Sequence, residues 1–93
     1  MENTNISNFL NESDCESFEN IGDIKFNKYL ARYTSKTGTK RFKTKKEAYI
    51  AMLVDSEAGG IVKSNNGYWT VRKGKILKIP SMKHQPEIAC LKK

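Results

Sequence analysis

Few residues in this 93-residue chain have the types and spacing that enzyme chemistry needs. A nucleophile requires a general base within reach, and the single histidine, His84, falls in a stretch that is typical of a loop. Most carboxylates lie in the first 24 residues, and no glycine-rich phosphate loop is present. We therefore predict a non-enzymatic protein without a cofactor.

The side chains that could bind a metal ion are Cys15, His84 and Cys90, and they lack the paired spacing of a zinc site. A structural zinc ion needs four ligands, so we predict no metal site. The two cysteines lie near opposite ends of the chain. We interpret them as reduced thiols, and a disulfide that ties the two ends together is the alternative.

The charge of the chain is divided unevenly along its length. Residues 1–24 carry six acidic residues and no basic one, whereas residues 25–93 carry all 17 basic residues and four acidic ones. We predict an acidic N-terminal arm over residues 1–23 and a basic domain over residues 24–93. Such an arrangement is typical of an interaction protein, and the basic part attracts anionic partners.

Aromatic residues are interleaved with the basic ones, as expected of hairpins that contact phosphates. The alternative is that lysine-rich strands only solubilise the domain and protect sheet edges. Lysines greatly outnumber arginines, which weakens a case for base reading. The partner is an acidic protein surface or the phosphates of nucleic acid, and the candidate binding residues are Lys28, Arg32, Lys36, Lys40, Arg41, Lys43, Lys45, Lys46, Arg72, Lys73 and Lys75.

The acidic arm has a composition typical of a segment that is flexible when alone. However, Ile6, Phe9 and Leu10 have helical spacing, so a short amphipathic helix could dock on a partner or on the domain. Alternatively, the arm could lie across the basic face and lower its affinity for other anions.

A single helix is predicted over residues 45–57. Thr44 and Glu47 have the spacing of a capping box, and the seven residues 48–54 that follow are all apolar. A helix that is apolar all round is buried, and Gly59 with Gly60 would end it.

The remaining patterns predict strands over residues 24–34, 39–42, 61–63, 68–72 and 75–79, with a further short strand over 88–91. Asn66-Gly67 predicts a tight hairpin turn, and Lys73-Gly74 predicts a second turn. The fold class is therefore α+β, a small antiparallel ββαββ sheet with a possible extra C-terminal strand, packed on one buried helix. The predicted core residues are Tyr29, Ala31, Phe42, Ala48, Ala51, Met52, Ile61, Trp69, Val71, Leu77 and Ile88.

Residues 29–52 resemble the strand pair and helix of DNA-binding domains in tyrosine recombinases and plant ethylene-response factors. The matching positions at the helix start are Phe42, Thr44, Glu47 and Ala48. The resemblance implies DNA binding through the hairpin. Those domains place Trp and Arg residues on the strands that read DNA. In this chain only Arg32 and Arg41 could serve in their place.

Residues 43–93 resemble short domains of nucleocytoplasmic large DNA viruses. The resemblance implies a viral structural or accessory protein and no chemistry. Cysteines that are common in those domains are replaced by Met52 and Ala58, which implies a core without a covalent staple. The matching residues are Thr44, Glu47, Ala48, Gly59, Gly60, Ile61, Gly67, Tyr68, Arg72, Gly74, Leu77, Glu87, Ile88, Leu91 and Lys92.

Together these patterns predict a non-enzymatic viral interaction or structural protein, associated with the virion, that docks through its basic face and acidic arm. The alternative is a module that binds double-stranded DNA through its basic hairpins. No secretory signal or membrane span is apparent. We therefore expect the protein in the virion or in the host cytoplasm or nucleus, with a second copy of the chain as a further possible partner.

Overall fold

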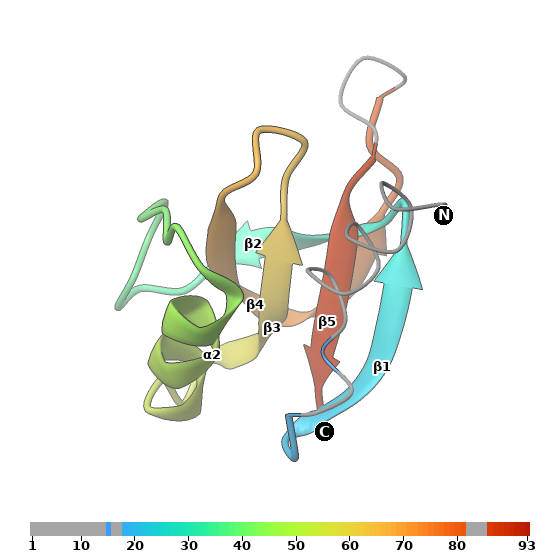
Figure 1. The fold of residues 1–93 in the computed structure, drawn as a ribbon. Coiled ribbons are helices and arrows are strands. Elements are labelled where there is room, and N and C mark those ends of the chain that lie inside the picture. The colour runs from blue at the N-terminus through green and yellow to red at the C-terminus, as the bar shows by residue number, and fades with distance from the viewer. Residues whose placement is uncertain (1–14, 16–17, 82–85) are drawn as a thin grey trace, which may run out of the picture.

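The described residues form five antiparallel strands and one helix (Figure 1). The computed structural model describes residue 15, residues 18–81 and residues 86–93. The sheet has the strand order β1-β5-β3-β4-β2, and the helix α2 packs against β3 and β4. The predicted α+β class is confirmed. The elements are β1 (Ile21–Phe26), β2 (Tyr29–Tyr33), α2 (Lys45–Leu53), β3 (Ala58–Lys63), β4 (Trp69–Lys78) and β5 (Ile88–Lys92).

The sheet curls back on itself. Strands β1 and β2 lie at opposite ends of the strand order, yet only Asn27 and Lys28 connect them. Asn27 has a φ of 58°, a left-handed conformation that asparagine tolerates well. Figure 1 shows β2 crossing behind the other strands, and the fully buried Leu30 packs with Val62 and Ala89. The sheet therefore buries apolar residues on both of its faces.

Two apolar clusters hold these layers together. The larger one lies between α2 and the sheet and includes Met52, Ile61 and Trp69. The smaller one lies inside the curl and contains Leu30, Val62, Ala89 and Leu91. Of the predicted core, Ala48, Met52, Ile61, Trp69, Val71 and Ile88 are buried, whereas Tyr29, Ala31, Phe42, Ala51 and Leu77 are only partly buried.

The helix starts as predicted but is shorter and less buried. The Thr44 hydroxyl accepts a hydrogen bond from the Glu47 amide at 3.1 Å, and the Glu47 carboxylate accepts one from the Thr44 amide at 3.3 Å. The capping box is thus confirmed. The prediction of burial all round is wrong, because only Ala48 and Met52 are buried and Ile50 is 51% exposed. One side of the helix covers the sheet and the other faces solvent.

Gly59 and Gly60 do not end the helix, which stops at Leu53. They lie inside β3, where neighbouring strands approach closely. A Cβ atom at Gly59 would collide with the Gly74 carbonyl, and one at Gly60 would collide with the Cys90 carbonyl. The predicted C-cap is therefore wrong, and the glycine pair serves strand packing instead.

Three predicted strand boundaries are also wrong. Residues 24–34 form parts of two strands, and residues 39–42 contribute only an isolated bridge between Phe42 and Trp69. Lys73-Gly74 is not a turn but lies inside the continuous strand β4, where an irregularity in the pairing with β2 follows Lys73 and Gly74 has a φ of 72°. The predicted hairpin at Asn66-Gly67 is confirmed, as is the C-terminal strand. Of the two turn residues only Gly67 has a positive φ, and its amide donates to the Ser64 carbonyl at 2.9 Å.

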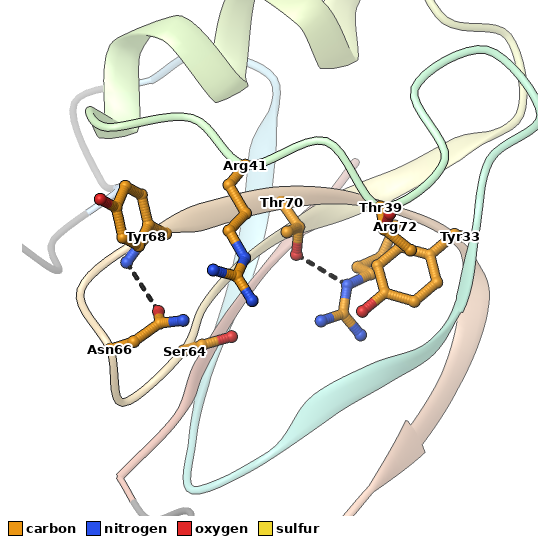
Figure 2. A pocket seen from close by; sticks show the side chains of 8 residues that line it. All are labelled: Tyr33, Thr39, Arg41, Ser64, Asn66, Tyr68, Thr70 and Arg72. Atoms are coloured by element: carbon orange, nitrogen blue, oxygen red, sulfur yellow. Dashed lines mark hydrogen bonds between the residues drawn. The ribbon is translucent and has the colours of Figure 1, made fainter.

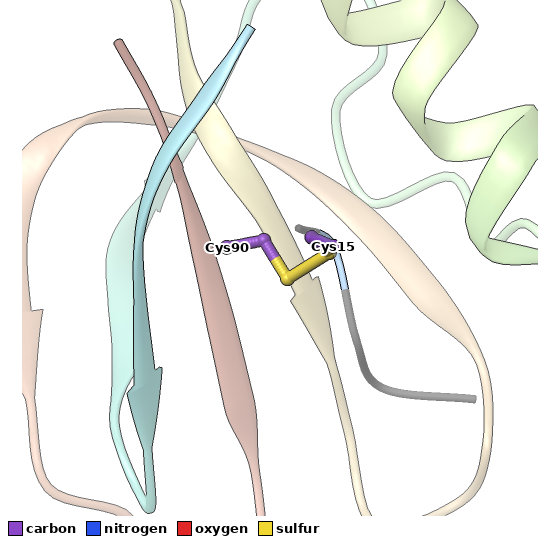
Figure 3. The surroundings of a disulfide bond; sticks show 2 residues. All are labelled: Cys15 and Cys90. Carbon is purple, nitrogen blue, oxygen red and sulfur yellow. A yellow bond between two sulfur atoms is a disulfide. The ribbon is translucent and has the colours of Figure 1, made fainter. Parts of the chain in front are cut away.

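A disulfide joins Cys15 to Cys90 in the centre of β5 (Figure 3). Both side chains are fully buried in the larger cluster. The prediction of reduced thiols is wrong, and so is the expectation of a core without a covalent staple. The predicted boundary between arm and domain, after residue 23, falls inside β1.

The proposed docking residues Ile6, Phe9 and Leu10, and also His84, lie outside the described residues. Among the helices of the described part, none has the length and apolar character to cross a membrane.

Candidate anion-binding surface

The segment between β2 and α2 carries four of the eleven candidate basic residues, and it is fixed at both ends. At its start, the Thr34 hydroxyl accepts from the Thr37 amide at 3.1 Å, and Glu57 accepts from the Ser35 amide at 2.6 Å. Near its end, Phe42 exchanges backbone hydrogen bonds of 2.7 and 2.8 Å with Trp69. The basic side chains between these anchors therefore project from an ordered backbone.

Three adjacent hollows lie along this segment. The arginine hollow, of about 570 Å³, is lined by Arg41 and Arg72 among others. The middle groove, of about 530 Å³, is lined by Lys40, Arg41 and Lys43. The helix-start hollow, of about 540 Å³, is lined by four lysines. Arg41 borders the first two hollows and Lys43 borders the last two, so the three form one continuous surface. We call it the basic strip, and its cations are Lys40, Arg41, Lys43, Lys45, Lys46, Lys63 and Arg72.

The helix-start hollow gathers Lys43, Lys45, Lys46 and Lys63 beside Trp69. Two of these lysines stand in the first turn of α2, where the helix dipole is already positive. The positive potential of the side chains and that of the helix end therefore add. An anion at this end of the strip would be attracted by both.

Negative charge along the strip is scarce. Of the described residues that line the three hollows, Glu47 alone carries a carboxylate. That carboxylate already accepts the Thr44 amide of the capping box. The described residues that line the strip therefore carry far more positive than negative charge.

The arginine hollow lies between the end of β2, the segment before α2 and the β3–β4 turn. Figure 2 shows Arg41 and Arg72 extending into it, on either side of Thr70. Arg72 is only 6% exposed. Burial lowers the pKa of its guanidinium, while the nearby Tyr33 hydroxyl and Glu87 carboxylate act in the opposite direction. The remaining residues that line the hollow are Tyr33, Thr39, Ser64, Asn66 and Tyr68.

Several predicted binding residues instead hold the fold together. The Lys36 ammonium donates to the Val54 carbonyl at 3.0 Å, just past the end of α2. Lys75 donates to the carbonyls of Gly59, at 3.1 Å, and Lys92.

Lys73 is likewise engaged within the chain, since its ammonium lies 3.7 Å from the Glu57 carboxylate. Lys28 and Arg32 line none of the three hollows. The structure thus brings together six of the eleven predicted residues: Lys40, Arg41, Lys43, Lys45, Lys46 and Arg72.

Sequence reasoning also missed part of the surface. Lys63 was not among the candidates, although it ends the strand that leads into the Asn66-Gly67 turn and lies beside Trp69. The alternation of Tyr68, just before β4, with Thr70 and Arg72 in the strand was the available signal for the arginine hollow. It could not reveal that Arg41, 31 positions earlier, would line the same hollow.

Within the described ranges, no group of three His, Cys, Asp or Glu side chains could hold a metal ion. The arrangement of the strip is suited to binding anions. Comparison with protein-family models, curated proteins and solved structures finds no match for this chain.

Proposed function

We propose that this chain is a non-enzymatic binding protein that docks an anionic partner on the basic strip. The observation that carries the proposal is the continuity of the strip, in which Arg41 and Lys43 each border two hollows. A partner with evenly spaced negative charges can contact all three hollows at once. A nucleic acid backbone has that property, because every nucleotide contributes one phosphate.

A second candidate keeps the same surface and changes the partner to an acidic protein within a virus particle. Two features favour it. Disulfides such as Cys15–Cys90 persist on virion surfaces and are rare in the cytosol. Ile50 lines the middle groove and is 51% exposed, and exposed apolar side chains of this kind anchor protein interfaces. Leu53 and Val54 are also exposed, at the other end of the helix. The viral setting itself rests on the sequence resemblance.

The salt dependence of the binding affinity distinguishes the two candidate partners. We would measure fluorescence anisotropy of a labelled DNA duplex and a labelled single strand with the protein over a salt series. Binding to phosphates weakens linearly in a log–log plot, with a slope of about 0.9 per phosphate contact on a duplex. If neither nucleic acid binds at about 100 mM salt, the nucleic acid partner is refuted and the acidic protein becomes the leading candidate.

A matched pair of variants tests the location. Lys43→Gln/Lys46→Gln removes two exposed cations of the strip, and Lys25→Gln/Lys78→Gln removes two exposed cations outside it. The first variant should lower the salt slope on the duplex by about 1.8, and the second should leave it unchanged. Equal losses for both variants would mean that total charge, rather than the strip, governs binding.

A further inference from the structure

The arginine hollow differs from the rest of the basic strip because it holds a buried and fixed guanidinium. Arg72 Nε donates to the Thr70 hydroxyl at 2.7 Å, and Nη1 donates to the Leu30 carbonyl at 2.7 Å. The guanidinium carbon lies 4.3 Å from the centre of the Tyr33 ring. These three contacts determine the direction in which the guanidinium points.

Arg72 has no close ion-pair partner among the described residues, although the Glu87 carboxylate acts on its charge over a longer distance. No acceptor of the described residues takes a hydrogen bond from Arg72 Nη2. Buried charges are normally paired, because leaving one unpaired is costly. The free Nη2 group borders a hollow that is open to solvent.

A second guanidinium enters the same hollow from the other side (Figure 2). Arg41 is exposed, and its guanidinium carbon lies 5.8 Å from the centre of the Tyr68 ring. Side-chain hydroxyls of Thr39, Ser64 and Thr70 also line the space. Two arginines and several hydroxyl donors in one hollow match the oxygens of a phosphate group.

The hollow has room for more than an inorganic ion. Its volume of about 570 Å³ falls in the range of small-molecule sites. Tyr33 and Tyr68 are 41% and 36% exposed, so part of each ring is available to a group attached to the phosphate.

We propose that the arginine hollow is a site for a phosphate monoester, held between Arg41 and Arg72. A monoester carries close to two negative charges at neutral pH, which matches two guanidinium groups better than the single charge of a backbone diester does. The continuity with the basic strip favours the terminal phosphate of a nucleic acid strand as its source. In naming that source, the inference rests on the proposed function.

The test compares two single strands of identical sequence, labelled at the 3′ end, with a phosphate or a hydroxyl at the 5′ end. We expect the protein to bind the phosphorylated strand about tenfold more tightly or better, because the added bonds are charge-assisted. Equal binding of the two strands would overturn the monoester site and leave the proposed function intact.

Variants locate the effect. Arg41→Gln should abolish the preference for the phosphorylated strand, whereas Lys40→Gln, which removes the same charge outside the hollow, should retain it. Arg41→Lys keeps the charge but loses the planar fork, and it should retain only part of the preference.

Arg72→Met should also abolish the preference, and the emission of the buried Trp69 checks that this variant is folded. A preference that survives Arg41→Gln overturns the assignment.

Two further probes separate the sources of the phosphate. Inorganic phosphate should shift the backbone amide NMR signals of Arg41 and Ser64 in the wild type and not in Arg41→Gln. If it does so while neither strand binds, the phosphate site stands and the proposed nucleic acid partner fails. A phosphoserine peptide that binds in an Arg41-dependent way, when the strands do not, would overturn the nucleic acid source.

Discussion

Removing the disulfide is expected to cost this protein a large part of its stability. We consider the double variant Cys15→Ala/Cys90→Ala and, in parallel, the wild type in reductant. The two cysteines are separated by 75 positions, so the bond closes most of the chain into one loop. In the chain-entropy treatment, a loop of this length stabilises the folded state by about 4.5 kcal/mol. Small domains have a total stability of about 5–15 kcal/mol.

The assay is equilibrium unfolding in urea, followed by tryptophan emission. Trp69 is the single tryptophan and belongs to the same buried cluster as both cysteines, so its emission reports on the region that the bond fixes. With a urea dependence of about 1–3 kcal/mol/M, the expected loss lowers the midpoint by roughly 1.5 M or more. The double variant itself should not respond to reductant, which provides the control.

Two results would count against this reasoning. If full reduction of the wild type, verified by thiol titration, changes the unfolding free energy by less than about 1 kcal/mol, loop closure does not contribute as argued. If the untreated protein already shows two reactive thiols, the bond is not formed at all. Either result would also weaken the support that the disulfide gives to a virion setting.

Three further outcomes follow from individual contacts. Thr44→Ala should lower the unfolding free energy by about 1 kcal/mol through loss of the N-cap, and Thr44→Ser, which keeps the hydroxyl, should restore most of it; unchanged stability in Thr44→Ala would contradict the capping role. Gly59→Ala should cost about 1–3 kcal/mol or more, measured by urea unfolding, because its Cβ would collide with the Gly74 carbonyl; a neutral result would mean that β3 and β4 separate easily. Hydrogen bonds from Ser35 are the main cause of the lowered pKa of Glu57, so this group stabilises the fold above pH 4.5 and loses that effect as the pH falls through its folded-state pKa. The stability difference between the wild type and Glu57→Gln should therefore shrink below about pH 4.5, and a constant difference from pH 7 to pH 3 would refute the linkage.

The features that the sequence predicts correctly depend on neighbours in the chain. The capping box joins residues three positions apart, and it forms as predicted. The Asn66-Gly67 pair predicts a hairpin between neighbouring strands, and the hairpin forms, although Gly67 alone of the two has a positive φ. The apolar run of α2 predicts a helix for the same reason, but it does not reveal that the helix lies on one face of the sheet with Ile50 exposed.

The features that were predicted wrongly depend on distant partners. Residues 39–42 have the pattern of a return strand for residues 29–33, but β2 pairs with β4 instead. Gly59 and Gly60 have the pattern of a helix end, and only the closeness of Gly74 and Cys90 shows why they lie in a strand. Long-range pairing of this kind depends on the packing of the whole sheet, which local patterns do not encode.

In the candidate site, too, neighbours in the chain determine some features and distant residues determine others, and Arg72 shows both. Its position on the polar side of β4 follows from the alternation of the strand, but its burial arises because β2 crosses over it and supplies the Leu30 carbonyl. The Arg72 guanidinium donates to the Thr70 hydroxyl and the Leu30 carbonyl, so it also has a structural role in joining β4 to β2. These two bonds leave Nη2 at the edge of the hollow, where no carboxylate of the described residues forms an ion pair with it. An anion bound there would accept charge-assisted hydrogen bonds from the guanidinium, which is the functional reason for an arginine at this position.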